Sequence, residues 1–215
     1  MTEEEVLTEL QRHNAVIRDT HVVYTSGRHG STYINKDGLY PDVTTLAQLC
    51  GAMAAGFRDV SVDVTAGPAV GGVVLAHWTA HHLSSESHPV RAVYAERDPS
   101  GTFVFRRGYP EIIRARSVLV VEDVLTTGGS AHAVIEAVRL AGGNVVGLAA
   151  ICDRGGIRLE DVGCPPRLVV LARVPLESWS ERDCPLCAQG VPINVEVGKG
   201  REYLVSIARR GRGTA

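Results

Sequence analysis

Two adjacent acids, Glu122 and Asp123, end an apolar run and precede a loop of small residues. The loop consists of Thr126, Thr127, Gly128, Gly129 and Ser130. Glycines let backbone N–H groups approach a phosphate closely, and the three hydroxyl groups can donate hydrogen bonds to the same oxygen atoms. A helix that begins at this loop would add a partial positive charge. The segment therefore predicts a phosphate site, with the acids suited to ribose hydroxyls or a Mg²⁺ shell.

Two better-known phosphate motifs fit this segment less well. A P-loop needs a lysine before its Ser or Thr, and the only lysines of the chain are Lys36 and Lys199. A dinucleotide fingerprint has its acid well after the glycines, whereas here the acids come before them. The plain alternative is a glycine-rich turn without a ligand, and the combination of two acids with three hydroxyls weighs against it.

Strands and helices alternate along the chain. The patterns predict helices over 2–18, 43–57, 71–83 and 130–141, and strands over 60–65, 90–95, 102–105, 117–121, 144–151 and 168–171. Such alternation is typical of an α/β fold with a parallel sheet, whose ligands bind at the carboxyl ends of the strands. We expect one domain over residues 1–208 and a disordered tail over 209–215.

Composition narrows the class of protein. Hydrophobic residues make up 45% of the 215 residues and the net charge is only -2, as in an ordinary folded domain. The acidic start and the lack of an apolar run of about 20 residues argue against secretion and membrane insertion. Five scattered cysteines indicate a reducing compartment. We expect a cytoplasmic protein that binds neither membranes nor nucleic acid.

The segment 118–130 resembles the motif with which type I phosphoribosyltransferases bind phosphoribosyl pyrophosphate (PRPP). Further segments are similar to the orotate phosphoribosyltransferase branch of that family, namely 26–29, 33–37, 67–72, 95–109 and 153–154. The resemblance implies the type I phosphoribosyltransferase fold, in which helices flank a central, mainly parallel sheet. It also implies a small hood formed by the N-terminal loop and the C-terminal segment.

The resemblance assigns expected roles to individual residues. It implies catalytic roles for Glu122, Asp123 and Arg97. It implies PRPP contacts for these three and for Thr126, Thr127, Gly128, Gly129, Ser130, Gly67, Ala69 and Gly71. The orotate-binding residues would be Arg154, Tyr33, Asn35, Lys36 and Thr126.

The implied reaction joins orotate to PRPP and gives orotidine 5'-monophosphate and pyrophosphate, a step of pyrimidine biosynthesis. The cofactor would be Mg²⁺ that enters with PRPP, and the resemblance further implies a homodimer. No covalent nucleophile is needed.

Each assignment has a structural alternative. Gly67–Gly72 can be a plain turn, and Arg154 can belong to a surface salt bridge. Tyr33 and Ile34 can be core residues, and the arginines of the 97–107 loop can be solvated.

The 96–108 segment departs from the family, because it holds neither the lysines nor the histidine that typical members carry there. Arg97 stands near the expected lysine. Two alternatives therefore remain open, a phosphoribosyltransferase for another base and a non-catalytic protein that senses PRPP or a nucleotide. A DNA-binding regulator is a weaker version of the second, because no basic recognition helix is evident.

Two further groups of residues have metal-ligating side chains. Cys184 and Cys187 form a CxxC, which is half of a zinc site, and the other half would need Cys152, Cys164 or a histidine brought close by the fold. A redox role for this CxxC is less favoured, because no thioredoxin-like context surrounds it. His77 and His81 lack the glutamate of a zinc-protease motif, so we expect a packing or surface role for them.

Overall fold

The computed structural model describes residues 1–24 and 26–212, with side chains up to 207. The chain divides into two compact units, the first formed by 1–6 and 42–175 and the second by 7–41 and the chain from Leu176 onward. The expected single domain over 1–208 stays a prediction. The last helix extends to Arg212, so it includes part of the expected tail, and 213–215 lie outside the described residues.

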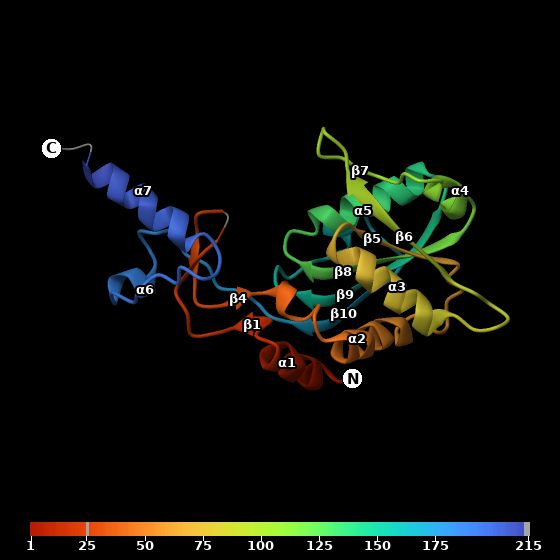
Figure 1. The fold of residues 1–215 in the computed structure, drawn as a ribbon, viewed down its shortest axis with the longest axis horizontal. Coiled ribbons are helices and arrows are strands. Elements are labelled where there is room, and N and C mark those ends of the chain that lie inside the picture. The colour runs from red at the N-terminus through yellow and green to blue at the C-terminus, as the bar shows by residue number, and fades with distance from the viewer. Residues whose placement is uncertain (25, 213–215) are drawn as a thin grey trace. The chain divides into compact units, whose positions relative to one another are not determined.

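The elements follow one another in the order shown in Figure 1. The α-helices are α1 (Glu3–Arg12), α2 (Val43–Ala55), α3 (Gly71–Leu83), α4 (Tyr109–Ile113), α5 (Gly129–Leu140), α6 (Pro185–Ala188) and α7 (Gly200–Arg212). The 3₁₀ helices are η1 (Lys36–Gly38) and η2 (Leu159–Val162). The strands are β1 (Val16–Ile17), β2 (Val22–Val23), β3 (His29–Gly30), β4 (Tyr33–Ile34), β5 (Val64–Pro68), β6 (Arg91–Arg97), β7 (Phe103–Val104), β8 (Ser117–Leu125), β9 (Asn144–Asp153) and β10 (Leu168–Arg173).

A six-stranded sheet in the order β10-β9-β8-β5-β6-β7 is the centre of the first unit. Its neighbours are parallel except for the β6–β7 hairpin. Figure 1 shows α2 and α3 on one face of the sheet and α4 and α5 on the other. The chain leaves β5 for β6 on one side and later returns to β8 on the other side of β5. The predicted mainly parallel sheet flanked by helices is confirmed, and its switch point lies between β5 and β8.

The strand β8 is buried along most of its length because both faces of the sheet are covered by helices. Val118 and Val120 join a hydrophobic cluster that includes Val134 and Val138 of α5. Successive strand residues point to opposite faces, so Leu119 points to the face that carries α2 and α3.

Helix α2 follows directly from its sequence. The Asp42 carboxylate accepts a hydrogen bond from the Thr45 N–H at 2.9 Å, which caps the first turn. Leu46, Leu49 and Met53 recur at helical spacing and are buried.

Some predicted boundaries are wrong. The first helix ends at Arg12 rather than at residue 18, since Asn14 adopts a left-handed φ of 51° and Val16–Ile17 pair with β4 instead. The strand predicted over 60–65 runs from Val64 to Pro68, because pairing with β6 continues to its last residue. The helices α4, α6 and α7 were not predicted.

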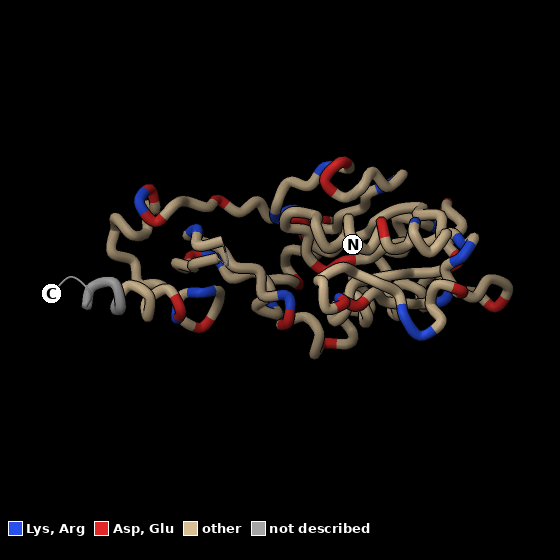
Figure 2. Tube along the Cα trace, turned by 90° about the horizontal axis from the view of Figure 1, so that it is seen from above, with Lys and Arg blue, Asp and Glu red and all other residues tan. Residues whose placement is uncertain are grey.

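Basic and acidic residues are interspersed along the described part of the chain, as the blue and red positions of the Cα trace show (Figure 2). None of the helices in that part combines the length and the apolar character that a bilayer crossing requires.

Replacement of a core leucine tests this description. We expect Leu119→Ala to lower the free energy of unfolding by about 2–5 kcal/mol, because it leaves a cavity under fully packed helices. The matched control is Leu140→Ala, whose side chain is 91% exposed, and it should change that value by less than about 0.5 kcal/mol. Urea unfolding followed by circular dichroism measures both, and equal effects would contradict the assigned core.

Candidate active site

Both acids of the predicted phosphate segment lie within β8 rather than after it. The exposed fractions of Glu122 and Asp123 are 6% and 4%. Glu122 Oε1 accepts a hydrogen bond from the Asp123 N–H at 3.1 Å, and Asp123 Oδ1 accepts one from the Val124 N–H at 2.7 Å. These bonds to backbone donors offset part of the cost of burying two carboxylates.

A hollow of about 80 Å³ lies where β8 turns into α5. Its lining consists of Glu122 and residues 124–131, so it includes all five loop residues predicted to bind PRPP. Drug-sized ligands occupy about 300–1,000 Å³, so this hollow is suited to a single group of about the size of a phosphate. One continuous segment therefore builds a small polar site at the N-terminus of a helix.

Gly128 fixes the shape of this turn. Its φ is +76°, and a Cβ added there would lie 2.7 Å from Val162 Cγ1 and 2.9 Å from the Asp161 carbonyl oxygen. Only glycine allows α5 to begin so close to η2 without strain. The first N–H groups of α5 have no partner inside the helix, which leaves them available to an anion in the hollow.

The two acids point to opposite faces of the sheet. Glu122 shares its face with Val118 and Val120, which pack with α5, and Asp123 shares the other face with Leu119. Glu122 thus lines the hollow beside α5, whereas Asp123 lies on the face where α3 begins.

The segment 67–72, which the resemblance implies to contact PRPP, connects β5 to α3 and is tightly folded. A Cβ on Gly67 would lie 2.5 Å from the Gly72 carbonyl oxygen, so the strand and the helix approach each other closely. The Ala69–Val70 peptide bond is cis. The Ala69 N–H donates to the Ala95 carbonyl at 2.8 Å, whereas Gly71 belongs to the first turn of α3. Gly71 is therefore better suited than Ala69 to donate its N–H to an anion.

Arg154 and Thr126 were both predicted to bind the base, and the structure brings them together. Arg154 Nε donates to Thr126 Oγ1 at 2.8 Å. The Asp153 carboxylate accepts hydrogen bonds from the N–H groups of Gly155, Gly156 and Ile157 at 2.9–3.0 Å, which fixes the loop that carries Arg154. A guanidinium held at the carboxyl end of β9 has a geometry that suits a planar carboxylate.

The arginines of the β6–β7 hairpin contact their own hairpin and the chain next to it. Arg97 donates to the Gly101 carbonyl at 2.7 Å, and its guanidinium lies 4.2 Å from the centre of the Phe103 ring. Arg107 forms an ion pair with Glu96, which raises the pKa of Arg107. These contacts agree with the solvated-hairpin alternative for this conformation, and a catalytic role of Arg97 stays a prediction.

The residues predicted to contact the base from the N-terminal loop belong to the second unit. Tyr33 and Asn35 are half-buried, and Lys36 is exposed. Ile34 is buried, so the core-packing alternative holds for it. The orotate contacts of Tyr33, Asn35 and Lys36 stay predictions.

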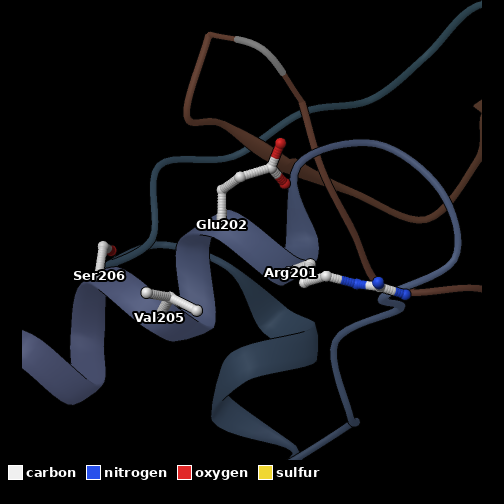
Figure 3. A pocket seen from close by; sticks show the side chains of 4 residues that line it. All are labelled: Arg201, Glu202, Val205 and Ser206. Carbon is white, nitrogen blue, oxygen red and sulfur yellow. The ribbon is translucent and has the colours of Figure 1, made fainter.

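A larger hollow of about 570 Å³ lies along α7 in the second unit. Figure 3 shows that its lining residues, Arg201, Glu202, Val205 and Ser206, all project from consecutive turns of that helix. A hollow with a single wall cannot surround a ligand, and it contains none of the predicted site residues. We therefore place the candidate site at β8.

On α3, His77 is exposed and bonds the Val73 carbonyl of its own helix at 2.7 Å, and the rings of His81 and Trp78 are in contact. These contacts agree with the expected packing or surface role.

Comparisons of the sequence with a family model and with curated proteins identify the same family. Residues 42–175 match the family described as "Phosphoribosyl transferase domain", and this range is nearly the whole first unit. The orotate phosphoribosyltransferases of Caldanaerobacter subterraneus subsp. tengcongensis and Chlorobaculum parvum are each 37% identical, and the matches cover 89% and 90% of this chain and 95% of each relative.

Solved structures agree with this result. The orotate phosphoribosyltransferase of Aeropyrum pernix superposes with a TM-score of 0.65 at 27% identity, over 79% of this chain and 93% of that protein. The Mycobacterium tuberculosis H37Rv enzyme in complex with PRPP superposes with a TM-score of 0.55 over 80% of this chain and 89% of that protein, and at 20% identity it supports the fold alone.

Gly128, in the turn between β8 and α5, provides a test of this packing. We expect both Gly128→Ala and Gly156→Ala to cost about 1–2 kcal/mol of stability for a left-handed alanine. Gly128→Ala should cost more, since its Cβ would meet Val162, whereas Gly156 has nothing within 4 Å. Chemical denaturation measures the difference, and equal losses would show that η2 does not pack against the turn.

Proposed function

The chain belongs to the orotate phosphoribosyltransferase family, and we propose that it transfers the phosphoribosyl group of PRPP to orotate, giving orotidine 5'-monophosphate and pyrophosphate. The single observation that carries the proposal is the β8–α5 segment, which combines two buried carboxylates with a hollow of phosphate size. Arg154, held beside that hollow, supplies the charge that a carboxylate-bearing base requires.

The hollow would anchor the 5'-phosphate of PRPP. The N–H groups of Gly128 and Gly129 and the hydroxyls of Thr127 and Ser130 would donate to its oxygen atoms. These groups are remote from the reacting carbon, so the binding energy that they supply positions the ribose for the reaction.

Glu122 and Asp123 would bind the ribose hydroxyls and favour the transition state. When the anomeric C–O bond breaks, positive charge develops on the ribose and negative charge on the leaving diphosphate. Fixed carboxylates beside the ribose stabilise that positive charge. The N-terminus of α3 with Gly71 would accept the leaving diphosphate.

The donor set at β8 fits the expected cofactor. Mg²⁺ takes oxygen ligands and is usually held by one or two carboxylates together with substrate phosphates, and Glu122 and Asp123 offer carboxylates. When bound, Mg²⁺ would supply charge neutralisation to the diphosphate.

The base would be oriented by Arg154 and Thr126, and orotate contacts of Tyr33, Asn35 and Lys36 stay predictions from the resemblance. In this proposal Arg97 replaces the lysine of typical relatives, and it would leave Gly101 and Phe103 to reach the diphosphate. A guanidinium binds phosphate oxygens in pairs, so its geometry differs from that of an ammonium group.

A homodimer, a place in pyrimidine biosynthesis and a cytoplasmic location are further predictions from family membership. Because Arg97 contacts its own hairpin, a protein that binds PRPP without turnover is the second candidate.

Turnover tests the function directly. We expect the protein to consume orotate when PRPP and Mg²⁺ are present, and Glu122→Gln or Asp123→Asn to lower kcat by about 10²–10³-fold through loss of transition-state stabilisation. Loss of orotate absorbance measures the rate, and Glu136→Gln on the surface of α5 is the control. PRPP binding by calorimetry without turnover of any base would favour the sensor, and turnover of another base alone would exclude orotate.

Arg154 gives a separate prediction. Arg154→Ala should raise the KM for orotate by about 10–100-fold, since a charge-assisted hydrogen bond is worth about 1.5–3 kcal/mol. The KM for PRPP should change little. The exposed Arg58→Ala is the matched control. Steady-state kinetics with each substrate varied in turn provides both constants, and a rise confined to the KM for PRPP would contradict the assignment.

A further inference from the structure

Four side chains with metal-ligating atoms meet inside the second unit. They are His21, His29, Cys184 and Cys187, and their ligand atoms all lie within 4.8 Å of one another. The first three are buried and Cys187 is half-buried. The CxxC thus has its partners, and they are histidines, whereas Cys152 and Cys164 belong to the first unit and not to this cluster.

The distances between these atoms fit one tetrahedral ion. Zn–S bonds of about 2.3 Å and Zn–N bonds of about 2.0–2.1 Å separate tetrahedral ligand atoms by about 3.3–3.8 Å. Cys187 Sγ lies 3.3 Å from His29 Nδ1 and 3.7 Å from His21 Nε2, and Cys184 Sγ lies 3.6 Å from His21 Nε2. The two ring nitrogens are 2.9 Å apart, which is closer than in a zinc site, and all four ligand atoms lie within 4.8 Å of one another.

The hydrogen bond of His21 fixes its ring in the tautomer that a metal ligand requires. His21 Nδ1 lies 2.7 Å from the Val191 carbonyl oxygen. A carbonyl can only accept, so Nδ1 carries the proton and Nε2 presents its lone pair to the cluster. Metal-binding histidines usually have their second nitrogen fixed in this way.

The backbone explains why residues far apart in the sequence meet. The β2–β3 pairing brings His29 opposite Val23, next to the strand that His21 precedes. Cys184 caps the N-terminus of α6 and Cys187 lies one turn later, so both thiols point to the same side.

Neither a bonded pair of histidines nor a redox pair of cysteines accounts for all of this geometry. A hydrogen bond between the histidines explains their 2.9 Å contact but not the two thiols that converge on the same nitrogens. A redox pair of cysteines explains the CxxC but not the two buried imidazoles.

The second unit has short strands and a small apolar core. Its sheets are two-stranded, and each of their strands has two residues. Among its described residues the buried apolar side chains are few, namely Leu10, Ala15, Val16, Val22, Val23, Ile34, Leu39 and Cys184. Small units with little core are commonly stabilised by a metal.

We propose that His21 Nε2, His29 Nδ1, Cys184 Sγ and Cys187 Sγ bind one structural Zn²⁺. Two thiolates and two imidazoles in a tetrahedron are the donor set that zinc prefers, and four protein ligands leave no open position for catalysis. The ion would hold the β2–β3 hairpin against α6, and this role is independent of the transferase reaction.

Metal analysis of the full-length protein tests the site. Protein expressed with trace metals should contain about one zinc per chain by mass spectrometry, as a closed four-ligand site predicts. Cys184→Ser and His29→Gln should lose that zinc, whereas the controls Cys164→Ser and His77→Gln, both at exposed positions outside the cluster, should keep it. Zinc-free wild type that takes up no Zn²⁺, or variants of the cluster that retain it, would overturn the proposal.

A second measurement keeps the test decisive if the variants do not fold. Wild-type protein stripped with a chelator and titrated with Co²⁺ should develop the visible bands of a tetrahedral thiolate site. The melting temperature should fall after stripping and recover with Zn²⁺ but not with Mg²⁺. A colourless Co²⁺ form, or a melting temperature that is insensitive to stripping, contradicts a structural zinc.

Discussion

The position of β5 between β6 and β8 is the constraint on which the rest of the site depends. Parallel strands need right-handed crossovers. The chain passes from β5 through α3 to β6 in one direction along the sheet and from β8 through α5 to β9 in the other, so α3 and α5 lie on opposite faces. The loops after β5 and β8 then diverge, and the edge of the sheet between them opens. Two helix N-termini border that opening, and each attracts negative charge.

Glu122 and Asp123 change which ligands this opening would favour. Two phosphate loops alone would bind any diphosphate ester, and carboxylates placed between them oppose that binding. Because strand residues alternate, one acid lies on the α5 face and the other on the α3 face. In the proposed reaction the ribose of PRPP would lie between its two phosphate groups and beside these acids, where negative charge would stabilise a developing cation.

The sequence was informative where a single continuous segment carries the chemistry. Residues 118–130 hold the strand, the acids, the turn and the start of the helix, so local spacing alone predicted the arrangement. The sequence was not informative where segments that are distant along the chain form one cluster of side chains. The two-residue strands of the second unit have no measurable periodicity, and His21 is 163 residues from Cys184 along the chain. A CxxC therefore indicated half of a cluster whose other half only the β2–β3 pairing could supply.

Each unit therefore has its own source of stability. Leu119, Val120 and Leu148 are fully buried in the first unit, and this core provides the free energy that keeps its loops in place. The second unit buries little, yet it carries the residues expected to contact the base, and those residues must keep a defined geometry to discriminate between bases. A metal ion can supply order without a large core, because its bonds replace buried area as the source of stability. In the proposed site, the CxxC would thus supply part of the order that the small core of the second unit does not provide.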